Sequence, residues 1–205
     1  ESRISADEEI HAAGYIKPDF RIGDFREVLS DIPDGSVDLI LTDPPYGEKA
    51  IKLYEDLGTF ASRVLKPDGS LIAYSGQSVL GDVLLALSRS LRYWWTLCMK
   101  HSGTGQKLPG KWVFVDWKPI VWFVKERRRS NNFVKDFLLG EIPDKTSNPW
   151  AQGAGETEYL VQELTAIGDL VVDPFAGTGE WGKGVGRLGR RWIGSDLQPG
   201  GGMNI

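Results

Sequence analysis

Short apolar runs alternate with helical patterns along most of the chain. Residues 37–42 form an apolar run typical of a strand buried on two faces. The apolar positions from Tyr54 to Leu65 then recur at helical spacing, and Pro67-Asp68-Gly69 follows as a turn signal. Further strands are expected at 20–22, 71–74, 93–99, 119–125, 170–172 and 191–195, and further helices at 79–91, 160–167 and 180–188. This alternation predicts an α/β fold whose mostly parallel sheet carries helices on both faces.

A few segments fall outside this alternation. Residues 1–14 form a polar leader, the Gly-rich stretch 102–110 is expected to be a mobile loop, and 141–155 resembles a connecting loop. The remaining pattern contains no repeat, so residues 1–205 are expected to form a single domain.

Composition narrows the class of protein. Hydrophobic residues make up 41% of the chain and charged residues 25%, values typical of globular proteins. The single cysteine, Cys98, cannot form an intramolecular disulfide, and no apolar run approaches the ~20 residues of a membrane span. His11 and His101 have no Cys or His at metal-binding spacing, so no metal is expected. These features predict a cytoplasmic protein that does not act at a membrane.

The net charge of −4 hides an uneven distribution. Residues 100–135 carry nine Lys and Arg against two Asp and Glu, whereas the flanking parts of the chain are acidic. Five of the eight tryptophans lie in or just before this segment: Trp94, Trp95, Trp112, Trp117 and Trp122. A basic segment with interleaved aromatics fits a nucleic-acid backbone, although charge alone favours a solvated face.

A glycine-containing turn, Asp173-Pro174-Phe175-Ala176-Gly177-Thr178-Gly179, directly follows the expected strand at 170–172. Its glycines allow a tight turn that brings backbone N–H groups close to a ligand. Asp196 follows Asp173 by 23 residues, at the end of the last expected strand, where an acid can accept hydrogen bonds from ribose hydroxyls. The pattern therefore indicates a nucleoside-containing cofactor.

A second polar segment, Thr42-Asp43-Pro44-Pro45-Tyr46-Gly47, follows the strand at 37–42. Two prolines remove two N–H donors and leave carbonyls that only accept, while Asp43 adds a carboxylate and Tyr46 a ring. This set suits a planar ligand with an amino group, whose N–H bonds the acceptors hold while the ring stacks on its face. Taken alone, it equally fits a rigid turn.

Together the two segments resemble those of DNA amino-methyltransferases, the family that methylates the exocyclic nitrogen of adenine or cytosine. Asp43-Pro44-Pro45-Tyr46 matches the catalytic tetrapeptide and Asp173–Gly179 the S-adenosylmethionine loop. The tetrapeptide precedes the cofactor loop, as in the circularly permuted, beta-type members. Weaker matches are Gly23-Asp24-Phe25, residues 34–40, residues 64–69 and residues 188–194. The resemblance implies a Rossmann-like S-adenosylmethionine-dependent methyltransferase fold with a seven-stranded sheet.

The resemblance also implies roles for individual residues. Asp43 and the Pro44 carbonyl would accept hydrogen bonds from the target amino group, Pro45 would keep the turn rigid and Tyr46 would stack on the base. The S-adenosylmethionine contacts would be Asp24, Phe25, Gln152, Asp173, Phe175, Gly177, Gly179 and Asp196. The Gln152 assignment rests on Asn148–Gly153, which replaces a His-Pro…Gln-Lys-Pro-like segment of relatives. Glu180–Gly184 departs from the small-residue helix start that is usual there, and its glycines are expected to loosen the turn.

Double-stranded DNA is the expected partner, with residues 100–150 as the target-recognition segment. Candidate phosphate contacts within it are Lys107, Lys111, Arg127, Arg128 and Arg129. Asp43 at the head of the tetrapeptide resembles adenine-N6 enzymes more than cytosine-N4 enzymes. The alternatives are an N4-cytosine enzyme, methylation of an amine in RNA or protein, and a DNA- or cofactor-binding module with impaired catalysis. The resemblance also implies a bacterial or phage-encoded protein that forms a homodimer or is attached to a further domain.

Overall fold

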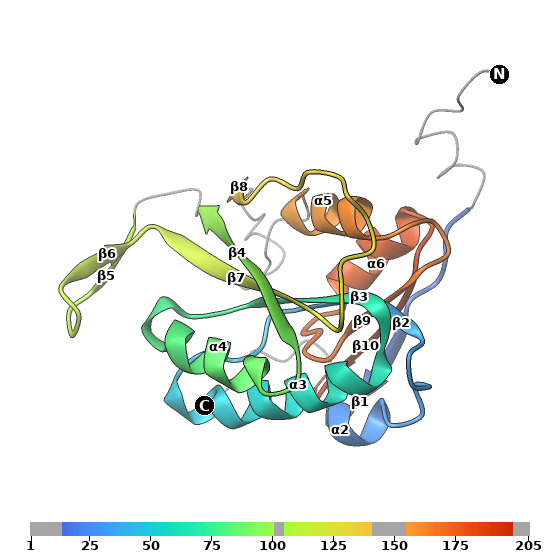
Figure 1. Cartoon of the computed structure of the whole chain (residues 1–205), viewed down its shortest axis with the longest axis horizontal. Coiled ribbons are helices and arrows are strands. Elements are labelled where there is room, and N and C mark those ends of the chain that lie inside the picture. Colours follow the sequence, from blue (N-terminus) through green and yellow to red (C-terminus); the bar gives the residue numbers. More distant parts are fainter. Residues whose placement is uncertain (1–13, 101–104, 141–154, 199–205) are drawn as a thin grey trace.

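A computed structural model of the chain describes residues 14–100, 105–140 and 155–198. Eight strands of these residues form one sheet in the order β1-β10-β9-β2-β3-β7-β4-β8 (Figure 1). They are β1 (Asp19–Ile22), β2 (Val37–Thr42), β3 (Leu65–Tyr74), β4 (Arg92–Lys100), β7 (Trp117–Val124), β8 (Phe137–Leu139), β9 (Leu170–Asp173) and β10 (Arg191–Asp196). The five strands β1-β10-β9-β2-β3 pair in parallel with one another, while β7 runs antiparallel to β3 and β4. The mostly parallel sheet is confirmed.

The main sheet has eight described strands rather than the seven that the resemblance implied. The additional strand is β8, three residues that pair in parallel with β4 at the edge of the sheet. Such a short strand carries too few positions for a periodic pattern to reveal it.

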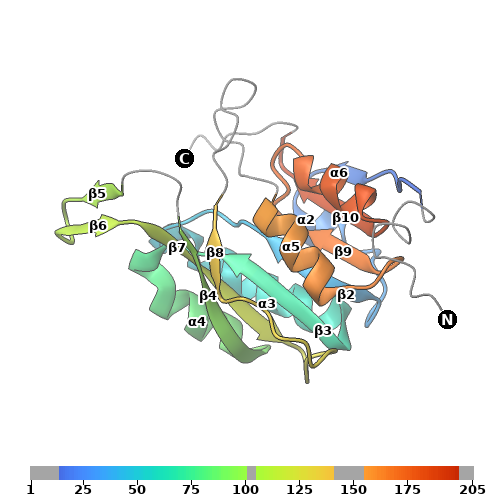
Figure 2. The same ribbon diagram turned by 90° about the horizontal axis from the view of Figure 1, so that it is seen from above.

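Helices cover both faces of the sheet, as expected (Figure 2). On one face lie α2 (Phe25–Val28), α3 (Ile51–Val64) and α4 (Leu80–Ser88), and on the other α5 (Gly155–Leu164) and α6 (Glu180–Arg187). Short 3₁₀ turns precede α3 and α4 at Glu48–Ala50 and Gln77–Val79. Two hydrophobic clusters, one on each face, hold these layers together. The helix expected over 160–167 begins and ends earlier than the pattern indicated.

The turn signal at Pro67-Asp68-Gly69 interrupts strand pairing without ending the element. Val37 is paired with Leu65 and Leu39 with Ser70, so four residues of β3 bulge out of the ladder with β2. Carbonyls of the bulge still find partners, because Pro67 O accepts from Glu126 N at 3.0 Å and Gly69 O from Lys125 N at 3.2 Å. The strand expected at 71–74 is thus the regular part of a longer strand.

The expectation of a loop over 102–110 is wrong in its second half. Two short antiparallel strands, β5 (Gln106–Leu108) and β6 (Val113–Val115), form a hairpin that projects from the sheet (Figure 1). Trp112, in the hairpin turn, is 91% exposed and has a positive φ of 55°. Glycine content suggested mobility there, whereas cross-strand pairing determines the structure.

The glycines of α6 permit close packing instead of loosening the turn. A Cβ at Gly182 would lie 2.6 Å from the buried Trp192 ring, and one at Gly186 would lie 2.2 Å from the Ile16 carbonyl oxygen. Trp181, in the same helix, contacts the Tyr74 ring at 5.6 Å between centroids. The absence of a side chain at Gly182 therefore makes room for the bulky Trp192 ring of the adjacent β10.

Gly182→Ala is expected to destabilise the fold by about 1–3 kcal/mol, because the added methyl group displaces the Trp192 ring. Gly81→Ala in α4 is the matched control: nothing lies within 4 Å of its Cβ position, and a gain of about 0.5 kcal/mol is expected from helix propensity. Urea unfolding of both variants measures the difference. Equal stabilisation by the two substitutions would contradict the packing explanation.

Candidate functional site

The two motif-bearing strands, β2 and β9, are neighbours in the sheet and end side by side. The chain leaves β2 toward β3 on one side, and β9 toward β10 on the other, so their carboxyl ends form a topological switch point. At this point Thr42 Oγ1 donates a hydrogen bond of 2.6 Å to Asp173 Oδ1. Phe175 N donates to the same Oδ1 at 3.2 Å. The tetrapeptide and the glycine-containing turn are therefore held together although 131 residues separate Thr42 from Asp173.

Asp173 is a buried carboxylate with unusual electrostatics. Its side chain is 1% exposed, and burial raises the pKa of Asp173 to about 7 against the lowering effect of the hydrogen bond from Thr42. The neighbouring acids Asp43 and Asp196 raise it further. A carboxyl group in this position changes its charge near neutral pH.

The turn after Asp173 has the shape of a ligand cradle. Gly177 and Gly179 have φ values of 54° and 75°, which suit glycine, and nothing lies within 4 Å of the Cβ position at Gly177. Gly177 N donates to Asp196 Oδ2 at 2.9 Å, so the acid at the end of β10 lies against the turn. Open space beside a carboxylate and backbone N–H groups fits the ribose and amino-acid parts of S-adenosylmethionine.

The start of α2 completes this side of the site. Gly23 N donates to Asp196 O at 2.8 Å, and the Phe25 and Phe175 rings are in contact at 5.2 Å between centroids. The structure thus brings Asp24, Phe25, Phe175 and Asp196 together, as expected. Asp24 has a further task, because its Oδ1 caps α2 through Arg26 N at 2.9 Å and its carboxylate pairs with the Arg26 side chain. The Arg26 guanidinium lowers the pKa of Asp24.

The tetrapeptide forms a partly open acceptor site. Pro44 and Pro45 are buried, Asp43 is half-buried and Tyr46 is 41% exposed. The Tyr46 hydroxyl donates to Asp43 Oδ1. A residue without a sequence signal joins them, since Lys118 Nζ lies 3.4 Å from Asp43 Oδ2. The pattern of β7 suggested only a buried strand, and its pairing with β3 brings Lys118 to the site.

The three arginines among the candidate phosphate contacts lie at the opposite edge of the sheet from Asp43. Arg129 pairs with Asp38 at 3.0 Å and with Asp169, and these acids stand at the beginnings of β2 and β9. The six residues of β2 separate the two edges by roughly 20 Å. Arg128 is engaged over the Trp122 ring at 5.0 Å, and burial lowers its pKa. Arg127 is exposed, but at this same distant edge.

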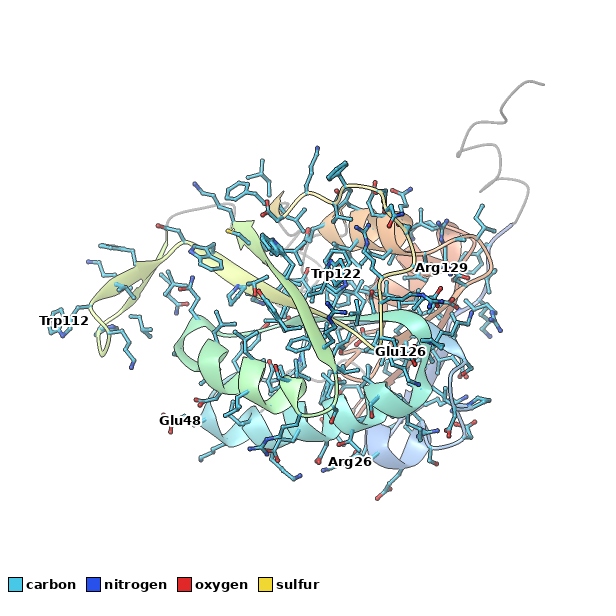
Figure 3. The ribbon with its side chains drawn as sticks, in the orientation of Figure 1. Arg26, Glu48, Trp112, Trp122, Glu126 and Arg129 are labelled. Carbon is cyan, nitrogen blue, oxygen red and sulfur yellow. The ribbon has the colours of Figure 1, made fainter. Side chains whose placement is uncertain are left out.

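Lys107 and Lys111 have a different position, on the exposed hairpin that leads into β7. Figure 3 shows Trp112 of this hairpin and Arg129 on opposite sides of the molecule. Lys107 Nζ lies 5.7 Å from the centre of the Phe114 ring. Of the five candidate phosphate contacts, only Lys107 and Lys111 lie on this hairpin, which directly precedes β7 and Lys118.

Some expectations fall outside the described residues: Gln152, His11, His101, nearly all of the leader 1–14, and parts of 100–150. Within the described ranges, no group of three or more His, Cys, Asp or Glu residues is arranged to hold a metal ion. None of the described helices is long and apolar enough to cross a membrane.

Stability is expected to depend on pH through Asp173. Its pKa of about 7 in the folded chain exceeds the ordinary value of about 3.9 in the unfolded chain. The folded state therefore binds the proton more tightly, and this contribution to stability is lost as pH rises from about 4 to 7. Asp173→Asn lacks the titrating group, so its stability relative to the parent protein should rise by about 2–3 kcal/mol from pH 5 to pH 8.

Urea unfolding of the cofactor-free protein at the two pH values measures this effect. Asp82→Asn, which removes an exposed carboxylate of α4, is the control. A stability difference between Asp173→Asn and the parent protein that is the same at pH 5 and pH 8 would contradict a pKa of about 7 for Asp173 in the folded chain.

Known proteins with similar sequences are methyltransferases, although no family profile matches the chain. Type II methyltransferase M.BglII from Bacillus subtilis is 38% identical over 238 residues, which cover 86% of this chain and 64% of the relative. Type II methyltransferase M2.DpnII from Streptococcus pneumoniae is 23% identical over 222 residues, covering 85% and 83%.

Solved structures give the same result for the fold. PvuII DNA methyltransferase, described as cytosine-N4-specific, superimposes with a TM-score of 0.78 at 20% identity and covers 91% of this chain and 84% of that chain. The M1.HpyAVI–SAM complex superimposes with a TM-score of 0.72 at 20% identity, covering 89% and 94%. The Rossmann-like methyltransferase fold is confirmed. In sequence the chain is thus similar to Type II DNA methyltransferases and in fold to cytosine-N4 and other DNA methyltransferases, and its tetrapeptide on β2 precedes the glycine-containing turn on β9.

Proposed function

We propose that this protein is a site-specific DNA methyltransferase that methylates the exocyclic N6 of adenine. The observation that carries this proposal is the hydrogen bond from Thr42 to Asp173, which holds an amino-accepting tetrapeptide directly beside a nucleoside-binding turn. A methyl donor and a methyl acceptor bound at these two places would be in immediate contact, which is the main requirement for direct transfer.

The cofactor of the proposed reaction is S-adenosylmethionine, which when bound supplies a methyl group on a sulfonium centre. Asp196 would accept hydrogen bonds from its ribose hydroxyls, and Gly177 and Gly179 would let the backbone approach it closely. Phe25 and Phe175 offer an apolar surface for its adenine ring. Asp24 would contribute only the part of its carboxylate that Arg26 leaves accessible.

The acceptor side must overcome the poor nucleophilicity of an aryl amine, whose nitrogen lone pair is delocalised into the ring. Asp43 and the Pro44 carbonyl would accept the two N–H bonds of the target amino group and favour a pyramidal nitrogen. The exposed part of the Tyr46 ring would stack on the base. Transfer then needs positioning and electrostatics, without a covalent enzyme intermediate.

The target base must leave the duplex to reach this site, because Asp43 lies at the end of a buried strand. Flipping the base costs a few kcal/mol. We assign the target as adenine because the tetrapeptide begins with Asp43, and cytosine N4 is the alternative, favoured by the structural likeness to PvuII DNA methyltransferase. We further propose that 1–205 acts as one methyltransferase domain, with the target-recognition segment in 100–150.

Methyl transfer from labelled S-adenosylmethionine to unmethylated genomic DNA tests the function. The expected product after nuclease digestion and mass spectrometry is N6-methyladenine, and Asp43→Ala is expected to reduce kcat at least about 100-fold by removing one acceptor. Asp34→Ala is the matched control, since Asp34 is an exposed carboxylate that precedes the start of β2, whereas Asp43 follows its end.

The products separate the alternatives. N4-methylcytosine would reassign the target base, and sequencing of the methylated DNA would reveal the recognition site in either case. The absence of transfer to any DNA by a folded protein that still binds S-adenosylmethionine in calorimetry would contradict the proposed activity.

Within the proposed DNA-contact segment, the hairpin lysines are expected to carry phosphate contacts. The double variant Lys107→Ala/Lys111→Ala should weaken DNA binding and reduce the slope of log K against log salt by about 1.8, because each phosphate contact contributes about 0.9. Arg127→Ala at the opposite edge is the control and should leave the slope unchanged. Fluorescence anisotropy at several salt concentrations measures both. An unaltered slope in the double variant would remove the hairpin from the interface.

A further inference from the structure

Lys118 is a lysine enclosed by the residues of the acceptor site. It lies on β7, and its Nζ is 3.4 Å from Asp43 Oδ2. The same ammonium group lies 4.7 Å from the centre of the Tyr46 ring and 5.1 Å from that of Tyr74. One cation therefore contacts the carboxylate and the aromatic ring that the proposed reaction needs.

The Lys118 side chain is better covered than its two partners in the acceptor site, Asp43 and Tyr46. The Lys118 side chain is 15% exposed, against 18% for Asp43, while Tyr46 as a residue is 41% exposed. Lysine is seldom this buried unless its charge is paired, and here a carboxylate and two rings compensate it. Because Lys118 is better covered than Tyr46, it supports the site from the inner side and leaves the exposed part of that ring to the base.

Two backbone contacts hold Lys118 in place. Ser75 N donates to Pro119 O at 3.0 Å, and Gln77 Nε2 donates to Trp117 O at 2.8 Å. The residues on either side of Lys118 are thus tied to the segment that follows β3. A rigid backbone limits the positions that the ammonium group can take.

We propose that Lys118 is a positioning residue for methyl transfer, which keeps Asp43 ionised and fixes Tyr46 relative to it. This inference rests on the proposed function. A carboxylate accepts two N–H bonds well only when it is ionised and correctly turned, and a cation on one of its oxygens favours both. The contact of Lys118 with the Tyr46 ring then joins the stacking surface to the acceptor in one geometry.

The charges around Asp43 make this cation important. The groups that act on Asp43 include the Tyr46 hydroxyl, Lys118, the phenols of Tyr54 and Tyr74, and the buried acid Asp173. Lys118 is a cation among them, and Asp173 is a second acid. Replacing Lys118 by a neutral residue would leave Asp43 beside this second acid without the favourable charge of the ammonium group, which disfavours the ionised carboxylate that accepts from the amino group.

Steady-state methylation of DNA containing the mapped site tests the inference with Lys118→Met, Lys118→Arg and the control Lys17→Met, an exposed lysine that precedes β1. Lys118→Met is expected to lower kcat about tenfold or more, to change the KM for DNA less than about threefold, and to shift the acidic limb of the pH–rate profile upward. Lys118→Arg should recover most of kcat because it retains the charge, and Lys17→Met should behave like the parent protein.

Other outcomes overturn the inference. A Lys118→Met variant with unchanged kcat and pH profile does so, and so does one that only raises the KM for DNA and lowers its salt dependence, which would make Lys118 a phosphate contact. Lys118→Gln replaces Lys118→Met if the latter folds poorly by circular dichroism. The parent rate in the same assay is the separate test of the proposed function: an inactive parent contradicts that function, whereas an active parent with an equally active Lys118→Met contradicts the role of Lys118 alone.

Discussion

The hydrogen bond between the Thr42 hydroxyl and the buried Asp173 carboxylate joins the ends of two strands that the chain places far apart. A buried carboxyl group must find donors, because an unpaired one is costly in a medium of low polarity. Thr42 supplies one donor and the Phe175 amide another, and these two donors come from the two motif-bearing segments. The requirement to satisfy one buried acid therefore fixes where the tetrapeptide begins relative to the glycine-containing turn.

This constraint explains why the order of the motifs along the chain has little effect on the site. Strand β9 lies between β2 and β10 in the sheet, whichever of them is synthesised first. Asp196 reaches the turn from β10, and Gly23 at the end of β1 binds the Asp196 carbonyl, so four parallel strand ends converge on one place. A permuted chain keeps the same neighbours in space, and the neighbours determine the chemistry.

The parts of this structure that the sequence predicted well are those determined by local patterns. The apolar run 37–42, the rigid Pro44-Pro45 and the positive-φ glycines Gly177 and Gly179 each have the expected structure. Lys118 was missed because its contact with Asp43 depends on the register of β7 with β3, which no local pattern specifies. The local sequence also does not specify at which edge of the sheet a charged residue lies. Arg129, for example, pairs with Asp38 at the start of β2, away from Asp43.

The basic segment 100–135 therefore divides into parts with different physical roles. At the far edge, Arg129 neutralises Asp38 and Asp169, two acids that stand where parallel strands begin, and this pairing uses its charge within the fold. At the near edge, the ammonium group of Lys118 is enclosed by Asp43 and two rings, so its charge acts on the site itself. The hairpin carries Lys107 and Lys111 into solvent, where no described acid is paired with them by a salt bridge. The charges of the hairpin are thus available to a polyanion, whereas those of Arg129 and Lys118 are used within the fold, so the segment contributes less attraction than its composition suggests.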